Sequence, residues 1–256
     1  MIFRISQLIA ASLFLCSSCE QKVQKDTRLL PFQLYGDFLN VIGSSQNGLE
    51  HDKYSYFLKD YEVKHGKYRR AQKLGLWKYK FDEIEFDLDW SIYNSKDERF
   101  SFAYPTGWKL DTKKEFDVFF QTDQSNPNLR FVLIENIVGD SINLIDYVSD
   151  YLIDLRSNNR IINSQLLKIV HDSVSFFYLK STVDGGSRQY NFYVLLYKRD
   201  GKIYDFTYIT DSQFSLSKEV IFFDVVYGFF INGDRILTPY VDYEIEEINI
   251  TETQAS

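Results

Sequence analysis

The side chains with the most distinctive chemistry are two cysteines, Cys16 and Cys19, in the stretch FLCSSCEQK. The 256-residue chain contains no others. A CxxC pair performs redox chemistry when it lies beside a βαβ unit, but this pair follows Arg4 and an apolar run over residues 5–15. That order is the architecture of an export signal peptide. Because the run is shorter than the roughly 20 residues that cross a bilayer, we expect cleavage rather than a permanent membrane helix.

Two small residues, Ser17 and Ser18, precede the second cysteine. Together they resemble the lipobox of bacterial lipoproteins, in which the cysteine thiol receives acyl chains such as palmitate and becomes the first residue of the mature protein. The resemblance implies a signal peptide over residues 1–18, lipidation of Cys19 and a lipidated tether over residues 19–30. It also implies a place in the bacterial cell envelope, lipid-anchored on the periplasmic side or at the cell surface. The alternative is an ordinary secretory signal that is cut near Ser18.

Other residue types that build catalytic or metal sites do not form such a site in the sequence. The three histidines, His51, His65 and His171, lack metal-ligand spacing such as HxxxH. The stretch SLSK at residues 215–218 matches the SxxK of penicillin-binding enzymes, but the companion KTG motif is absent and a helix N-cap accounts for the serine. No GxSxG, P-loop or GxGxxG motif occurs. We therefore predict no catalytic residue, no cofactor and no metal ligand.

The charge of the chain is negative overall and unevenly distributed. A formal net charge of −7 argues against general nucleic-acid binding. Residues 51–80 carry nine lysines and arginines, whereas residues 234–256 carry six acids against one arginine. We expect a contact surface in the basic stretch that faces anionic lipid headgroups or an acidic partner, and the alternative is a solvated polar face. The residues predicted for this contact surface are Tyr68, Arg69, Arg70 and Lys73.

The basic residues belong to a predicted β-hairpin or meander module over residues 31–95. The stretch YEVKHGKYRRAQKLGLWKYKF alternates strand-forming aromatic residues with charged ones, and we expect breaks at Gly66 and Gly75. Gly66 to Tyr68, followed by residues 72–79, resembles the GxY...KxGxWxY pattern of MORN-like hairpin repeats of the YwqK type. One good copy is present, and such repeats need stacking neighbours to bury their faces. We therefore predict a single repeat-like hairpin that packs on another part of the chain.

The rest of the chain shows two runs of strands. RFSFAYPTGWKLDT gives two strands with a break at residues 105–107, and DVFFQTD and NLRFVLIENI give two more. Three further strands follow a helix, with Asp-Gly turn signals at residues 184–185 and 200–201. Short turns of this kind predict antiparallel pairing between consecutive strands.

Two helices separate and close these runs. The first is capped near Ser141 and has one apolar face, and the second begins at Ser215 and is apolar nearly all round, which predicts deep packing. An antiparallel sheet with helices packed on it, preceded by a small β-meander, belongs to the α+β class. The apolar residues at helical spacing in the first helix are Leu144, Val148, Tyr151, Leu152 and Leu155.

Four short stretches in this order carry a family resemblance. They are Phe100 to Pro105 with Gly107-Trp108, the helix opened by Ser141, Gly201 to Tyr204, and Gly228 to Ile231. Together they resemble the PsbP-like fold, an αβα sandwich shared by photosystem II extrinsic subunits, a nuclear Ran-binding protein and bacterial periplasmic lipoproteins of the DcrB type. The resemblance implies a PsbP-like domain over residues 96–233. The charge distribution predicts an acidic tail over residues 234–256. The family is mostly non-enzymatic and binds other proteins, so the resemblance implies docking or assembly.

Two classes of function follow, with a third as a distant alternative. The first, which we predict, is a membrane-anchored envelope lipoprotein that acts as a non-catalytic protein-binding or assembly factor. Its partners are then the membrane, through lipidated Cys19, and an unidentified envelope protein, with no nucleic acid. The second is a lipoprotein that binds or senses a small apolar or metal ligand, in a pocket lined by Tyr and Phe between sheet and helix. A hydrolase is the third.

Overall fold

The computed structural model describes most of the chain after residue 38. The described residues are 23–27, 39–46, 49–58, 61–81, 84–111, 117–139, 141–158, 160–171, 174–213, 215–237 and 243–249. The predicted signal peptide, Cys19 and most of the predicted tether lie outside these ranges, as do residues 250–256 of the predicted acidic tail.

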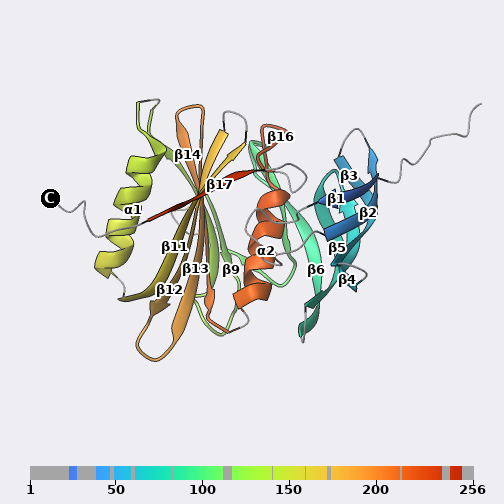
Figure 1. Ribbon diagram of the computed structural model, residues 1–256, viewed down its shortest axis with the longest axis horizontal. Coiled ribbons are helices and arrows are strands. Elements are labelled where there is room, and N and C mark those ends of the chain that lie inside the picture. The colour runs from blue at the N-terminus through green and yellow to red at the C-terminus, as the bar shows by residue number, and fades with distance from the viewer. Residues whose placement is uncertain are drawn as a thin grey trace, which may run out of the picture.

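The first of two antiparallel sheets, sheet A, contains nine strands in the order β1-β2-β3-β4-β5-β6-β7-β15-β16. Its first seven strands are consecutive in the chain and each pairs antiparallel with the next (Figure 1). Alternating aromatic and charged residues produce such strands because successive side chains point to opposite faces. The strands are β1 (Val23–Thr27), β2 (Leu39–Gln46), β3 (Leu49–Leu58), β4 (Tyr61–Arg69), β5 (Gln72–Phe81), β6 (Ile84–Asn94), β7 (Phe100–Pro105), β15 (Phe230–Ile231) and β16 (Asp234–Arg235).

The second sheet, sheet B, contains eight strands in the order β17-β11-β12-β13-β14-β10-β9-β8, all paired antiparallel. Two helices accompany the sheets: α1 (Leu144–Asn158) and α2 (Ser215–Tyr227). The strands of sheet B are β8 (Lys109–Leu110), β9 (Val118–Gln121), β10 (Arg130–Ile137), β11 (Arg160–His171), β12 (Val174–Asp184), β13 (Gln189–Arg199), β14 (Lys202–Asp211) and β17 (Glu244–Ile248).

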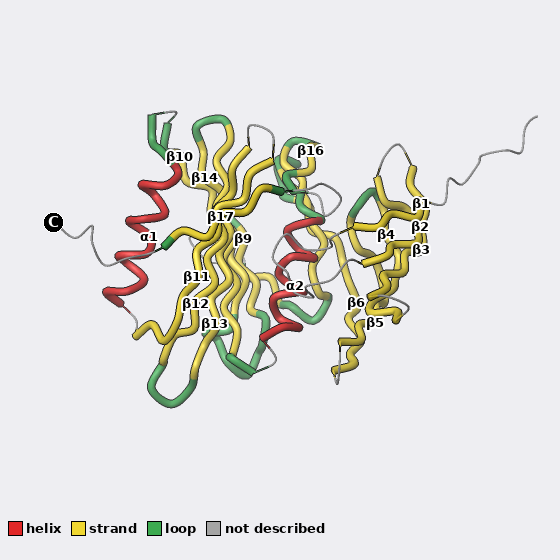
Figure 2. Tube along the Cα trace, in the orientation of Figure 1, coloured by secondary structure: helices red, strands yellow, loops and turns green. Residues whose placement is uncertain are grey.

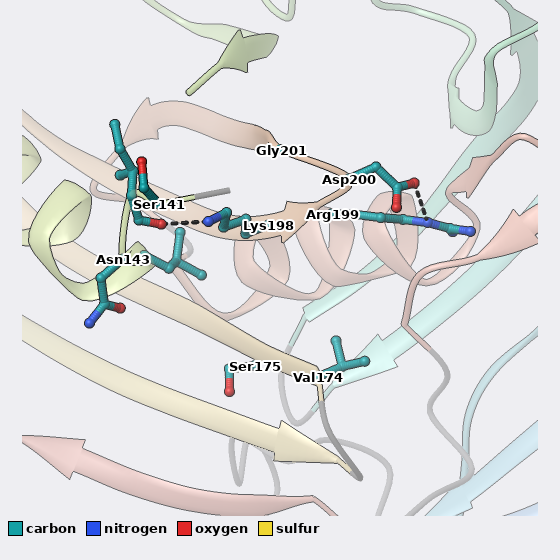
Figure 3. A pocket seen from close by; sticks show the side chains of 10 residues that line it. Ser141, Asn143, Val174, Ser175, Lys198, Arg199, Asp200 and Gly201 are labelled. Carbon is teal, nitrogen blue, oxygen red and sulfur yellow. Dashed lines mark hydrogen bonds and ion pairs between the residues drawn. The ribbon is translucent and has the colours of Figure 1, made fainter. Parts of the chain in front are cut away.

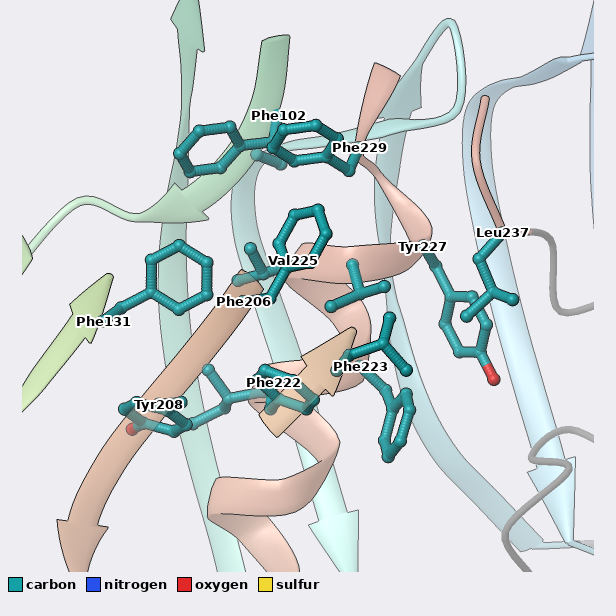
Figure 4. Packing of buried hydrophobic residues seen from close by; sticks show 14 of the residues in the cluster. Phe102, Phe131, Phe206, Tyr208, Phe222, Phe223, Val225, Tyr227, Phe229 and Leu237 are labelled. Carbon is teal, nitrogen blue, oxygen red and sulfur yellow. The ribbon is translucent and has the colours of Figure 1, made fainter. Parts of the chain in front are cut away.

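The elements form four layers, with α1, sheet B, α2 and sheet A in that order across the molecule (Figures 1 and 2). Helix α1 packs Val148 and Leu152 in a cluster with Val194 of sheet B. Helix α2 lies on the opposite face of sheet B, where Phe222 stacks near Tyr208 (Figure 4). Because sheet A covers the remaining side of α2, almost every face of this helix is buried, which explains its apolar sequence.

The predicted fold class, an α+β sandwich with helices packed on one sheet and a small β-meander in front, is wrong. The described residues are mostly antiparallel β-structure, with seventeen strands and two helices in the two large sheets and their connections. The error has a local cause. Phe100–Pro105 pairs with β6 and extends sheet A, whereas the sequence predicts it as the first strand of the meander that contains β9 and β10. The predicted boundary between residues 95 and 96 therefore falls inside a hairpin of sheet A.

Several local predictions are confirmed. Helix α1 carries its apolar residues as expected, and α2 begins at Ser215. The Asp-Gly signals at 184–185 and 200–201 do connect paired strands, β12 with β13 and β13 with β14.

Within the predicted acidic tail, residues 244–248 form strand β17 at the edge of sheet B.

The breaks expected at Gly66 and Gly75 are wrong, because both glycines lie inside strands β4 and β5. The chain turns instead at Arg70 and Ala71, whose φ angles of 50° and 63° are in the left-handed region. Asn-Gly is the usual pair in such a two-residue turn. A Cβ atom at position 66 would lie 2.3 Å from the Trp77 ring, so glycine is required there for the close approach of the indole.

Sheet A contains an internal repeat of 23 residues that spans the hairpins β2–β3, β4–β5 and β6–β7. Asp52, Gly75 and Glu98 occupy equivalent positions and have φ angles of 64°, 66° and 57°. Gly43 lies under Tyr54 as Gly66 lies under Trp77. Each copy therefore places the same bend and the same buried aromatic face in the sheet. The equivalent aromatic residues are Tyr54, Trp77 and Phe100, then Tyr56, Tyr79 and Phe102, all buried.

Candidate functional site

The four residues predicted for a contact surface do not share one environment. Arg69 and Arg70 are exposed at the tip of the β4–β5 hairpin. Tyr68 and Lys73 are only 8% and 1% exposed, so their assignment to a contact surface is wrong. They are register partners on β4 and β5 and point to the inner face of sheet A, because side chains alternate along a strand.

The inner face holds a buried charged cluster that joins sheet A to helix α2. Asp224 of α2 accepts hydrogen bonds from Lys64 Nζ at 2.8 Å and from Lys73 Nζ at 2.5 Å. Tyr79 donates to the same carboxylate at 2.9 Å and accepts a hydrogen bond from Lys73 at 2.8 Å. The cluster therefore satisfies its polar groups with one another.

Aromatic rings surround Lys73. Its Nζ atom lies 3.8 Å from the ring centroid of Trp77, 4.7 Å from that of Tyr79 and 5.2 Å from that of Trp90. Ring faces attract cations, most strongly where water is excluded. One copy of the repeat thus supplies both the buried lysine and the Trp77 and Tyr79 rings beside it.

Burial and charge act on this cluster in opposite directions. Burial lowers the pKa of Lys73 well below its usual value, although Asp224 acts against this. Burial alone would raise the pKa of Asp224, but Lys64 and Lys73 hold it below its ordinary value. Burial and then Asp224 raise the pKa of Tyr79 well above its usual value. Asp224 is accordingly the member of the cluster whose ionised form its surroundings favour.

A second set of polar contacts joins sheet A to the segment after α2. Arg235 donates to both carboxylate oxygens of Glu50, at 3.0 and 2.9 Å, and also to the carbonyl oxygen of Tyr227. Gln72 donates to the carbonyl oxygen of Gly228 at 3.3 Å. Glu50 and Lys73 are equivalent positions of the 23-residue repeat, so two copies use this same position to place a charged residue at the interface.

Lysine, tyrosine and aspartate are residue types that transfer protons in enzymes, but this cluster is closed. Lys73 and Tyr79 are 1% and 0% exposed, and Asp224 is buried between them. A catalytic group must come within hydrogen-bond distance of a substrate, and these side chains are covered by protein. We therefore assign the cluster a structural role, which is to fix sheet A to α2.

The outer face of sheet A is open and carries several cations. We name it the basic face and define it by Lys53, Lys67, Arg69, Leu74 and Leu76, all exposed. None of its three cations forms an ion pair within the described part of the chain. The two leucines are 39% and 56% exposed. This face combines unpaired charge with apolar surface, which is the combination found at contact surfaces.

A shallow hollow of about 560 Å³ lies at one end of sheet B (Figure 3). It is lined by residues of the segment before α1 and the start of that helix, of the beginning of β12 and of the β13–β14 hairpin. Lys198 closes part of it by donating to the carbonyl oxygen of Ile142 at 2.5 Å. Its lining contains neither Tyr nor Phe, so it is not the aromatic pocket expected for a ligand-binding protein.

The histidines take up separate places. His65 lies 3.0 Å from Glu62 on β4, and His171 packs against Tyr243. The described residues contain no group of three or more His, Cys, Asp or Glu that could hold a metal ion. In the same part of the chain, no helix has the length and apolar character to cross a membrane.

Comparisons with known proteins found partial matches among solved structures. No family model and no curated protein matches this chain. Part of it is similar to the solution structure of cyanobacterial PsbP (CyanoP) from Synechocystis sp. PCC 6803, with a TM-score of 0.43 and 19% identity over 56% of this chain and 92% of that one. PA94, a protein of unknown function from Pseudomonas aeruginosa, matches with a TM-score of 0.27 and 12% identity over 54% of this chain and 84% of its own. At this identity and TM-score, the PsbP-like domain, the lipidation and the MORN-like repeat all stay predictions.

Proposed function

We propose that this chain is a membrane-anchored envelope lipoprotein that acts as a non-catalytic protein-binding or assembly factor. The basic face carries this proposal, because it offers unpaired cations beside exposed leucines on an open sheet. Charge complementarity steers partners to such a face, and burial of apolar side chains then contributes affinity. Lys73 and Tyr79, whose pKa values burial shifts well away from their usual values, are used inside the fold.

The anchor and the repeat type belong to the same proposal. Lipidation of Cys19 is supported by the lipobox resemblance alone, since this residue lies outside the described ranges. We assign the three hairpins spaced by 23 residues to the MORN-like type, because units of such arrays stack so that each buries a face of its neighbour. The array then supplies an exposed outer face for a partner.

Crosslinking in bacterial cells tests the binding function. The tagged full-length protein and its Cys19→Ala variant are crosslinked, extracted with detergent and analysed by mass spectrometry. A discrete partner that is recovered with the wild type and lost with the variant supports a tethered assembly factor. Recovery of the bare protein from both strains argues against it.

Metabolic labelling with a fatty acid that carries an alkyne tests the anchor separately. The label is expected on the wild type and on the matched control Cys16→Ala, and not on Cys19→Ala, because only the second cysteine is the predicted acylation site. Label that depends on Cys16, or no label on any form, contradicts the anchor.

A further inference from the structure

The basic face is electrostatically unfavourable in the isolated protein. Lys53 and Lys67 are register partners on neighbouring strands, and like charges placed directly opposite each other destabilise a sheet. The acids Asp52 and Asp89 are exposed at the margins of this face, and neither pairs with these lysines in the described residues. A surface that costs stability in this way is a candidate for an external partner.

Apolar surface adjoins these charges. Leu74 is the register partner of Lys67 on the next strand, and Leu76 follows it on the same strand. Both leucines face outward because residues two apart lie on the same face of a strand, while Lys73 and Trp77 face inward. The partner of this face should therefore carry negative charge and exposed aliphatic side chains together.

Strand β17 has that composition. It has the sequence EIEEI, and its first four residues are exposed at the edge of sheet B. Ile245 is 41% exposed, beside Glu244 and Glu246, which form no ion pair within the described part of the chain. One edge of β17 pairs with β11, and no described strand pairs with the other.

The acidic strand and the basic face cannot meet within one molecule. The basic face points away from α2, because the inner face of the same sheet contacts that helix through Asp224. Strand β17 lies at the edge of sheet B, on the other side of α2 (Figure 1). We propose that the protein associates head to tail, with β17 of one copy on the basic face of a second copy.

This contact joins two different surfaces, so each added copy leaves one basic face and one acidic strand free. Such heterologous contacts produce rings where the rotation closes and open chains where it does not. The inference rests on the proposed function as a protein-binding factor, and it names a second copy of this chain as the partner of the basic face.

Sedimentation velocity of the full-length protein in a non-ionic detergent tests self-association by charge reversal. At about 0.05 M salt, the wild type should sediment as oligomers, and at about 1 M salt as monomers, because salt screens exposed charges. Lys53→Glu with Lys67→Glu should weaken association about tenfold or more, and so should Glu244→Lys with Glu246→Lys. An equimolar mixture of the two variants should associate again, because each then offers the charge that the other lacks.

Lys109→Glu with Arg188→Glu is the matched control, since it makes the same charge change at exposed residues outside the basic face. It should associate as the wild type does. A wild type that stays monomeric at low salt overturns the proposal, as does association that survives either reversal. Monomers that bind anionic vesicles through Lys53 and Lys67 also overturn it, in favour of a membrane surface.

The crosslinking experiment separates this inference from the proposed function. A different envelope protein crosslinked to a chain that stays monomeric overturns self-association and leaves the binding function standing. Monomeric protein with no crosslinked partner of any kind overturns both.

Discussion

Asp224 is the residue on which the contact between sheet A and helix α2 depends. It is the one carboxylate that receives hydrogen bonds from both Lys64 and Lys73, and all three side chains are buried. Removal of one partner from a buried ion pair leaves the other charge without compensation, which costs about 3–5 kcal/mol. A single substitution in this cluster should therefore lower the stability of the fold strongly.

Asp224→Ala is accordingly expected to reduce the free energy of unfolding by about 3–5 kcal/mol, measured by urea denaturation. The matched control is Asp234→Asn, which removes an exposed carboxylate paired with Arg199 at 2.7 Å and should cost no more than about 1 kcal/mol. Equal effects of the two substitutions would show that the buried cluster does not hold sheet A to the helix.

Asp205 of β14, in sheet B, should make the stability of the protein depend on pH. This buried carboxyl accepts a hydrogen bond from Thr207 at 2.7 Å, and burial raises its pKa to about 6 from 3.8. A raised pKa means that the folded protein holds this proton more tightly than the unfolded chain. Its contribution to stability is therefore largest below about pH 4 and is lost as the pH rises to about 6.

Relative to Asp205→Asn, the wild type should lose up to about 3 kcal/mol of stability between pH 4 and 6, with little difference in slope outside this window. Urea denaturation at a series of pH values measures it. Thr207→Val removes the hydroxyl that lowers this pKa and should extend the upper end of the window to higher pH, while its lower end, set by the unfolded chain, stays in place. Parallel stability curves for the wild type and Asp205→Asn would contradict the assignment.

At the scale of these residues, the sequence shows which side chains are charged but not which are buried. Lys73 lies in a basic stretch, so an exposed position was the natural expectation. Its burial depends on Asp224, which is 151 residues away in the chain. Alternation along β4 and β5 could have placed Tyr68 and Lys73 on the inner face, but only once the turn was known to lie at Arg70 and Ala71.

At the scale of elements, local patterns predicted both helices and the Asp-Gly hairpins, because helical spacing and turn residues act over a few positions. The turn at Arg70 and Ala71 carries no glycine or asparagine and gives no such signal. The 23-residue repeat was hidden for a related reason, since its bent position is occupied by three different residues, Asp52, Gly75 and Glu98. The period of the aromatic residues was the signal that could have revealed it.

The repeat makes a prediction about its glycines. Gly66→Ala should destabilise the protein by about 1–3 kcal/mol, because the new Cβ would meet the fully buried Trp77 ring. Gly43→Ala should act in the same way through Tyr54, whose ring lies 2.4 Å from the corresponding Cβ position. Thermal or urea denaturation measures both.

Gly107→Ala is the control for these substitutions, because no atom lies within 4 Å of its Cβ position and its φ is outside the left-handed region. It should change stability by no more than about 0.5 kcal/mol. If Gly66→Ala and Gly107→Ala have the same effect, the aromatic rings do not require the glycines beneath them.

At the scale of the whole molecule, helix α2 belongs to both sheets. Its aromatic residues pack on sheet B, where Phe222 stacks near Tyr208, while Asp224 is held by sheet A. The segment after α2 continues this link, because β15 pairs with β7 of sheet A. The two sheets therefore share one hydrophobic cluster. If α2 separated from either sheet, part of this cluster would be exposed to water.

We expect the sheets to unfold together for this reason, in a single cooperative transition. Trp108→Phe leaves Trp77 and Trp90 as fluorescent reporters of sheet A. Trp77→Phe with Trp90→Phe leaves Trp108, which packs 5.4 Å from Tyr208 of sheet B. In each variant, the urea midpoint from tryptophan fluorescence should coincide with that from far-UV circular dichroism. Two separate midpoints would mean that residues 31–95 and 96–233 unfold as independent units, in spite of the shared helix.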